Sequence, residues 1–187
     1  MSGWKNEAPV IFGEVLFDRF PDGSVVLGGA PFNVAWNLRA LGLDPLLVSR
    51  VGRDELGDRI LSAMEDWGLA RTGIQQDPQH PTGTVEVSVT DGEPVFDIAA
   101  GRAYDFISAA ELPTGTAQGL LYHGSLALRT EASRSALDRL REDVAGPVLM
   151  DVNLRKPWWS RGLVESLMDV ATWVKLNENE LAALVPE

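Results

Sequence analysis

The stretch Gly28-Gly29-Ala30-Pro31-Phe32-Asn33 leads from a short apolar segment into a helical pattern. The two glycines allow positive φ angles and a close approach of the backbone to a ligand, and Pro31 favours the first turn of a helix. Amides at a helix start can meet hydroxyl groups or an anion, while the Asn33 amide offers both a donor and an acceptor. Taken alone, the stretch fits an ordinary glycine-rich turn that caps a helix better than it fits a binding site, so its neighbours decide between the two.

The segments on either side of this turn alternate between strand and helix patterns. Upstream, residues 10–17 predict a strand, Asp22-Gly23 predicts a hairpin turn, and residues 24–27 predict the returning strand. Downstream, we expect helices over 32–41, 54–67, 131–143, 158–170 and 178–184, and strands over 45–51, 119–123, 147–152 and 172–176. Strands that alternate with helices predict an α/β fold, with a mostly parallel sheet covered by helices on both faces.

A second hairpin interrupts this alternation. Over residues 82–90, one face carries Thr84, Glu86 and Ser88 and the other carries Val85, Val87 and Val89; Asp91-Gly92 makes the turn and residues 94–99 return. Two hairpins do not fit inside a parallel sheet, so we expect them to form a small separate antiparallel sheet. Ligands of α/β folds lie beyond the carboxyl ends of the strands, and a β flap beside those ends would act as a lid.

The composition excludes several classes of function. The 187 residues carry 27 acidic and 16 basic side chains, a net charge of −11, which repels nucleic acid and anionic membranes; we expect neither as a partner. No cysteine is present, so disulfides and thiolate metal sites are excluded and a cytoplasmic location is expected. Residues 1–9 lack the apolar core of a signal peptide, and no apolar run reaches the length of a membrane span.

The spacing of glycines and an asparagine around the opening stretch is more specific than the stretch itself. With Gly28, Gly29, Asn33, Gly42 and Gly52 in their places, the chain resembles the ribokinase-like (PfkB) carbohydrate kinases, and most closely the fructokinases among them. The resemblance implies a ribokinase-like fold. Residues 1–187 would form the N-terminal part of a single domain, with lid segments at about 14–28 and 82–100.

The resemblance also implies a sugar site. Asp18 would accept hydrogen bonds from two sugar hydroxyls, because an ionised carboxylate is an acceptor, and Gly28, Gly29 and Asn33 would line the same pocket. Glu14 lies on the same predicted strand, before the hairpin, but a carboxylate at a strand end could simply cap a helix.

A second motif, Asp151-Val152-Asn153-Leu154-Arg155, follows a buried strand and matches the Asp-x-Asn-x-Arg of fructokinase-like members. Asn153 would then face the sugar and Arg155 would stabilise the transferring phosphate, since its planar guanidinium binds two oxygens at once. The alternative is a surface loop with an exposed arginine.

A third motif lies in Lys175-Leu176-Asn177-Glu178-Asn179-Glu180, where Asn177 and Glu180 match the Asn-x-x-Glu of the family. The resemblance implies that these residues, with Lys175, surround the phosphates of ATP, and that Glu180 contacts Mg²⁺ through water, as Mg²⁺ keeps several waters. Alone, the pattern equally fits a helix-starting capping box.

The family's catalytic base is not in this sequence. It is an Asp within a Gly-Ala-Gly-Asp motif, which these 187 residues do not contain. We therefore expect the sugar-binding part of a longer ATP-dependent sugar kinase, with fructose as substrate, that is inactive alone. The alternatives are a non-catalytic sugar- or partner-binding module and a related nucleoside kinase. Val85, Val87 and Val89 suggest a homodimer formed through the lid.

Overall fold

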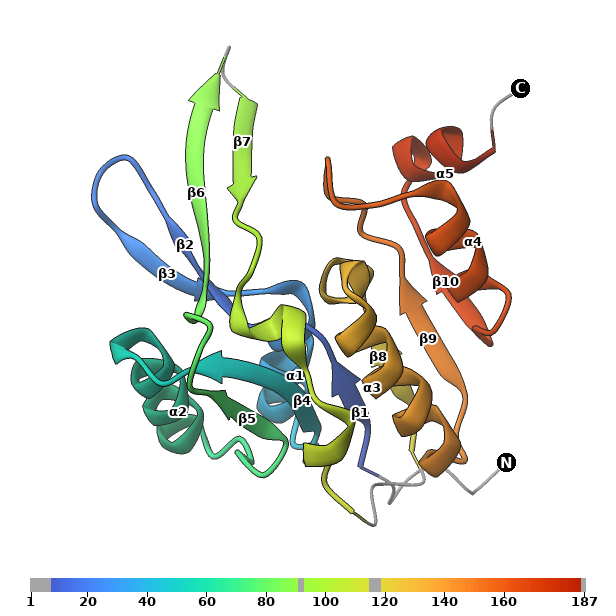
Figure 1. Cartoon of the computed structure of the whole chain (residues 1–187), viewed down its shortest axis with the longest axis horizontal. Helices are drawn as coiled ribbons and strands as arrows, with labels where there is room; N and C mark the ends of the chain where they lie inside the picture. The colour runs from blue at the N-terminus through green and yellow to red at the C-terminus, as the bar shows by residue number, and fades with distance from the viewer. Residues whose placement is uncertain (1–7, 91–92, 115–118, 186–187) are drawn as a thin grey trace.

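A computed structural model describes residues 8–90, 93–114 and 119–185. Its larger sheet has six strands in the order β10-β9-β8-β1-β4-β5, and every pairing in it is parallel (Figure 1). The strands are β1 (Val10–Phe12), β4 (Leu46–Gly52), β5 (Ile74–Asp77), β8 (Leu121–His123), β9 (Val148–Asp151) and β10 (Trp173–Lys175). The expected mostly parallel sheet is therefore confirmed.

Helices cover both faces of this sheet. They are α1 (Ala30–Ala40), α2 (Glu55–Trp67), α3 (Glu131–Asp143), α4 (Arg161–Met168) and α5 (Glu178–Leu184). Buried residues of α1 and α2 pack with Ile11 of β1, whereas those of α3, α4 and α5 pack with Val10 and Phe12, which point to the opposite face. Among the described helices, none is long and apolar enough to cross a membrane.

The helix ends follow from local chemistry. Asp54 caps α2, because its Oδ1 accepts a hydrogen bond from the Gly57 amide at 2.8 Å, and Gly68 ends the helix in the left-handed conformation at φ 71°. α4 begins at Arg161, three residues later than expected, because Ser160 supplies the cap. β5 was not predicted, since its sequence Ile-Gln-Gln-Asp lacks an apolar pattern.

The two hairpins form the expected separate sheet, which projects from the larger one (Figure 1). Its strands are β2 (Leu16–Arg19), β3 (Val25–Gly28), β6 (Gly83–Thr90) and β7 (Glu93–Ile98), in the order β3-β2-β6-β7. The hairpins join through a parallel pairing of β2 with β6, so the sheet is mixed and the expectation of a wholly antiparallel sheet is wrong. The local turn signals predict the pairing within each hairpin but not the pairing between them. The predicted turn at Asp91-Gly92 lies outside the described residues.

One surface prediction on this sheet is wrong. Val85 and Val87 are 3% and 6% exposed because they pack into the core beside Tyr104, so they are not available as a surface for a second copy. Nothing is described of the Val89 side chain. The exposed apolar side chains of the small sheet are instead Val25, Val26, Val95 and Phe96.

The single strand predicted over residues 10–17 is also wrong. β1 ends at Phe12, Gly13 takes a φ of 146°, and the chain crosses into the small sheet as β2. A side chain at Gly13 would place its Cβ 2.5 Å from Cγ of Pro31, so α1 packs directly against this crossing. Because all residues from Val10 to Phe17 are buried, hydrophobicity alone does not separate two short strands from one.

Candidate functional site

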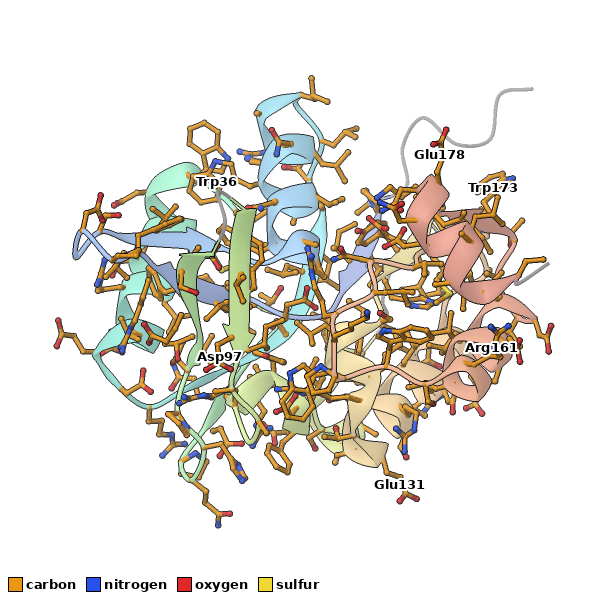
Figure 2. All side chains as sticks on the ribbon, turned by 90° about the horizontal axis from the view of Figure 1, so that it is seen from above. Trp36, Asp97, Glu131, Arg161, Trp173 and Glu178 are labelled. Atoms are coloured by element: carbon orange, nitrogen blue, oxygen red, sulfur yellow. The ribbon has the colours of Figure 1, made fainter. Side chains whose placement is uncertain are left out.

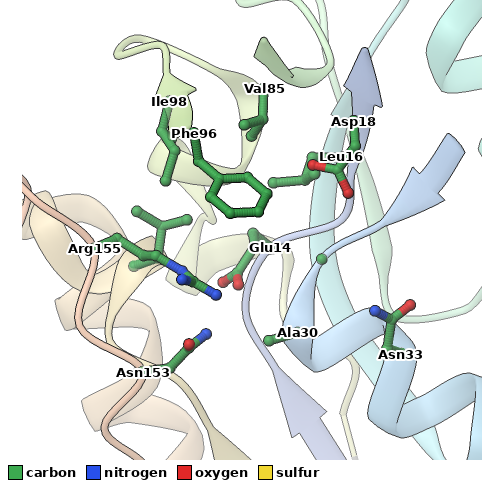
Figure 3. Close-up of a pocket in the computed structure, with 12 residues that line it drawn as sticks. Glu14, Leu16, Asp18, Ala30, Asn33, Val85, Phe96, Ile98, Asn153 and Arg155 are labelled. Atoms are coloured by element: carbon green, nitrogen blue, oxygen red, sulfur yellow. The ribbon is translucent and has the colours of Figure 1, made fainter. Parts of the chain in front are cut away.

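A pocket of about 160 Å³ lies where the two sheets meet (Figure 3). It is smaller than the roughly 300–1,000 Å³ of pockets for drug-sized ligands, so it suits a small molecule. Its lining combines polar and apolar side chains: Glu14, Leu16, Asp18, Gly29, Ala30, Asn33, Val85, Phe96, Ile98, Leu126, Asn153 and Arg155.

The fold brings most of the predicted sugar-site residues together here. Asp18 comes from β2, Asn33 from α1, and Asn153 and Arg155 from the loop after β9, and all of them line the pocket with Gly29. Gly28 lies behind this surface. A Cβ there would be 2.9 Å from Oδ2 of Asp18, so the missing side chain leaves room for that carboxylate.

Gly29 sets the contact between helix and crossing strand. It is the N-cap of α1 with a φ of 108°, and a Cβ there would lie 2.6 Å from the carbonyl oxygen of Glu14. Glycine is needed at this position for both reasons. The start of α1 thereby becomes one wall of the pocket.

The loop carrying Asn153 and Arg155 is held in an uncommon conformation. Asn153 has a φ of 40°, which is in the left-handed region. Ser125 Oγ donates a hydrogen bond to the Val152 carbonyl at 2.6 Å, and the Leu154 amide donates to Oε1 of Glu180 at 2.9 Å. These two bonds flank Asn153 and fix the turn that directs its side chain into the pocket (Figure 3).

Arg155 reaches across the pocket from this loop. Its guanidinium lies 5.7 Å from the ring centre of Phe96 on β7 and, within the described part of the chain, makes no ion pair. Burial raises the pKa of Asp18, and the positive charge of Arg155 opposes that shift. Because the Arg155 guanidinium has no ion-pair partner here, it is able to bind an anionic oxygen of a ligand.

Glu14 occupies the floor of the pocket, and sequence reasoning left its role open. It is 2% exposed, and its carboxyl group points toward Arg155 (Figure 3). Burial raises the pKa of Glu14 to about 7, although the amides of Glu14 and Ala30 and the charges of Arg155 and Arg129 oppose the shift. The signal in the sequence is an acid placed directly after an apolar run and a glycine.

A second, more open hollow adjoins the pocket. It is lined by Asn153, Leu154, Arg155, Lys156, Trp159, Asn177, Asn179, Glu180 and Ala183, so Asn177 and Glu180 are brought close to the second motif. Lys175 does not line it. Its Nζ instead contacts both carboxylate oxygens of Asp151, at 2.9 and 3.1 Å.

Asn177 and Glu180 form the capping box of α5. Asn177 Oδ1 accepts from the Glu180 amide at 2.9 Å, and Glu180 Oε2 accepts from the Asn177 amide at 2.8 Å. With the Leu154 bond, each oxygen of Glu180 accepts one hydrogen bond from a backbone amide. Residues 8–90, 93–114 and 119–185 hold no cluster of three potential His or carboxylate ligands. Contact of Glu180 with Mg²⁺ through water stays a prediction.

The lid side of the pocket is tied to the Arg155 loop. The Trp158 indole donates to the Ile98 carbonyl at 2.9 Å, and Arg129 donates to the Ala99 carbonyl at 2.7 Å. Arg129 is also paired with Asp105 at 2.7 Å and lies 4.4 Å from the Trp158 ring centre. The end of β7 is thus fastened to the loop that carries the predicted phosphate ligand.

Comparisons with known proteins agree with this architecture. Residues 10–187 match the model of the pfkB family carbohydrate kinases. The chain is 31% identical to a fructokinase of Klebsiella pneumoniae, over 92% of this chain and 61% of that protein. It is 29% identical to a putative sugar kinase of Pyrococcus horikoshii, over 90% of this chain and 56% of that protein.

Solved structures show the same fold. The sugar kinase of P. horikoshii superposes with a TM-score of 0.87 at 25% identity, covering 95% of this chain and 65% of that one. The apo fructokinase of Vibrio cholerae gives 0.84 at 29% identity, covering 97% and 67%. The chain therefore spans about three-fifths of the length of the curated relatives it matches.

Proposed function

The chain belongs to the pfkB family of carbohydrate kinases, and from this we propose that it forms the sugar-binding part of an ATP-dependent kinase that phosphorylates a sugar hydroxyl. Fructose is the proposed substrate. Several relatives are fructokinases, and the V. cholerae fructokinase was solved with fructose and ADP. Residues 1–187 would be the N-terminal part of one ribokinase-like domain, with the lid at about 14–28 and 82–100.

The observation that carries this proposal is the meeting of two hollows at Asn153 and Arg155. The enclosed pocket has Asp18 and Asn33 on one wall, and the open hollow adds Lys156 and Asn177. A sugar in the first and a nucleotide phosphate in the second would both contact Arg155. Phosphoryl transfer depends largely on such positioning and charge stabilisation.

Within the pocket, each wall has a proposed task. The Asp18 carboxylate accepts hydrogen bonds from two hydroxyls, and the Asn33 amide both donates and accepts. Val85, Phe96 and Ile98 of the lid cover the apolar face of the sugar and exclude water. Because Gly28 and Gly29 have no side chains, they leave room for Asp18 and for the start of α1 to contact the ligand.

Structures of relatives with bound nucleotide support ATP as the proposed phosphate donor. The P. horikoshii sugar kinase was solved in complex with ATP, and the V. cholerae fructokinase with ADP and calcium or potassium. We propose ATP as phosphate donor and Asn177 as a residue near its phosphates; Mg²⁺ as its companion ion and a role for Lys175 stay predictions. Because the Gly-Ala-Gly-Asp motif is absent from these 187 residues, we propose that this chain alone binds sugar without phosphorylating it.

Titration of the 187-residue chain with D-fructose, D-ribose and D-glucose, followed by NMR, tests the proposal. We expect fructose to bind, and Asp18→Asn to weaken binding about 10-fold or more, since a hydrogen bond to a charged group contributes about 1.5–3 kcal/mol. Asp169→Asn, an exposed change after α4, is the matched control. Absence of sugar binding, or equal affinity in the two variants, would contradict the proposed site.

A coupled assay with ATP, magnesium and fructose tests the second half of the proposal. We expect no turnover by the 187-residue chain. Turnover well above background would show that a residue within the chain serves as base.

Phe96 favours a second candidate, a nucleoside kinase. Its ring lines the pocket and is 43% exposed, so it is able to stack on a base. Adenosine binding that is tighter than fructose binding, and that is lost in Phe96→Leu, would favour this candidate over the sugar kinase.

We also propose a homodimer through the small sheet, with Val26 and Val95 in place of the buried valines. Val26 is 50% and Val95 is 46% exposed. They lie on opposite faces of the small sheet, on its edge strands β3 and β7, and an edge strand is able to pair with another chain. Light scattering that shows only monomer at high protein concentration would contradict this proposal.

A further inference from the structure

Glu14 is the most deeply buried carboxyl group of the pocket. It lies in the crossing between β1 and β2, where the chain leaves one sheet for the other, and it is 2% exposed while still lining the pocket. Asp18, in contrast, is half-buried. The two carboxyl groups thus stand at different depths of one small cavity (Figure 3).

One oxygen of Glu14 lacks a partner. Among the described residues, Oε2 is buried and receives no hydrogen bond. Buried polar atoms without partners are uncommon in folded proteins, and each costs about 1–3 kcal/mol. A helix-capping role accounts for the influence of the Ala30 amide on this group, but it leaves Oε2 unexplained.

The charged and titratable groups around Glu14 do not supply a hydrogen-bond partner for Oε2. Arg155 and Arg129 act on it through space, and it acts in the same way on the hydroxyl groups of Tyr104 and Tyr122. None of them forms an ion pair or hydrogen bond with Glu14 in the described chain. The carboxyl group of Glu14 lies instead among the side chains that line the pocket (Figure 3).

We propose that Glu14 is a further sugar-binding residue, whose Oε2 accepts a hydrogen bond from a hydroxyl of the sugar at the floor of the pocket. This inference rests on the proposed function and specifies it. Two carboxyl groups against the single guanidinium of Arg155 favour a neutral sugar over a sugar acid, because an added carboxylate would meet like charges in a space of about 160 Å³.

Binding of D-fructose to the wild type, Glu14→Gln and Glu131→Gln at pH 8 tests this inference, with thermal melting of each variant. Glu131 is exposed at the start of α3 (Figure 2). It does not line the pocket and is the matched control. We expect Glu14→Gln to weaken binding about 10-fold while its melting temperature stays equal or rises. The control should change neither quantity.

A structural role would give another result. Glu14→Gln that melts earlier and binds fructose as the wild type does would overturn the inference while leaving the proposed function intact. Wild-type protein that binds no sugar would overturn both, so the two failures are distinguishable.

Two measurements on the wild type do not depend on the folding of a variant. In protein labelled with ¹³C at glutamate carboxyl groups, fructose should shift the Glu14 resonance, and an unchanged resonance under saturating fructose would overturn the inference. D-gluconate should bind at least 10-fold more weakly than fructose, and equal binding would overturn the preference for a neutral sugar.

Discussion

Two regions of this molecule each bury a carboxyl group near the end of a strand. The two carboxyl groups differ in how many hydrogen-bond donors surround them. In the pocket, Glu14 follows β1 and keeps an oxygen without a partner. In the second region, which we call the Asp77 cluster, Asp77 ends β5 and is surrounded by donors. The cluster consists of Arg50, Gln75, Asp77, His80 and Glu111.

The Asp77 carboxylate is fully engaged. Its oxygens accept hydrogen bonds from Arg50 Nε at 2.9 Å, from the amides of Gln79 and His80 at 2.8 and 3.0 Å, and from the His80 ring at 3.0 Å. Burial alone would raise the pKa of Asp77, but these donors hold it well below its usual range. In Glu14 the same burial dominates and raises the pKa to about 7.

This difference in hydrogen-bond partners distinguishes a carboxyl group that stabilises the fold from one that is available to a ligand. A carboxylate whose acceptor sites are filled by the protein stabilises the fold and has nothing left for a ligand. A carboxyl group buried with a free acceptor destabilises the fold, and such sites are typical of functional positions. Because both carboxyl groups lie in the same chain, the stability of a Glu14 variant and that of an Asp77 variant can be compared directly.

Asp77→Ala should have the largest effect on stability. It leaves the Arg50 guanidinium, 11% exposed, without its buried partner, and breaking such a pair costs about 3–5 kcal/mol. Urea denaturation measures the free energy of unfolding, with Asp169→Ala as an exposed control. A loss below about 1 kcal/mol would show that the cluster does not hold β5 in place.

Glu14→Gln should change the pH dependence of stability. Because the pKa of Glu14 rises on folding from 4.5 to about 7, the folded state binds more protons between these values, and wild-type stability falls as the pH rises through them. The loss is roughly 3 kcal/mol, and it should be absent from Glu14→Gln.

Urea denaturation of both proteins at several pH values from 5 to 8 measures this difference. Parallel curves for the wild type and the variant would mean that Glu14 titrates normally and that the contrast with Asp77 does not hold. The Asp77 contribution has the opposite sign, since a lowered pKa gives stability that is lost as the pH falls through the acidic range.

Glu111→Gln should have the smallest effect. The Glu111 carboxylate contacts Arg50 Nη1 at 2.7 Å but is 48% exposed, and solvent weakens such a pair to about 0–1 kcal/mol. Arg50 keeps its bonds to Asp77 and Gln75. Denaturation that shows a loss near that of Asp77→Ala would mean that the rim of the cluster, and not its buried centre, carries its stability.

Much of the pocket could be predicted from the sequence because its residues lie in local motifs. Asp18, Gly29, Asn33, Asn153 and Arg155 were all predicted for one site, and the structure brings them together. Their roles toward sugar and phosphate stay predictions. β5 was missed because two glutamines and an aspartate occupy it. The buried polar side chains of Gln75 and Asp77 are explained by hydrogen bonds with Arg50, Ser108, Gln79 and His80, which the fold brings beside them.

Other features depend on contacts that no local pattern contains. The engagement of Glu180 with the Leu154 amide joins residues 26 positions apart, and the burial of Val85 and Val87 depends on packing beside Tyr104. The sequence pattern presented these valines as one face of a hairpin, which is correct, but it did not say whether that face meets solvent or the core.

By itself, the sequence determined the alternation of strands and helices, the two hairpins and the motif residues of the pocket, because backbone propensities, turn chemistry and glycine spacing act over a few residues. Only the tertiary structure decided that Glu14 is buried with a free oxygen and Asp77 with every acceptor filled. The free energy of a buried charge depends on the donors around it, and those donors come from segments that only the fold brings together.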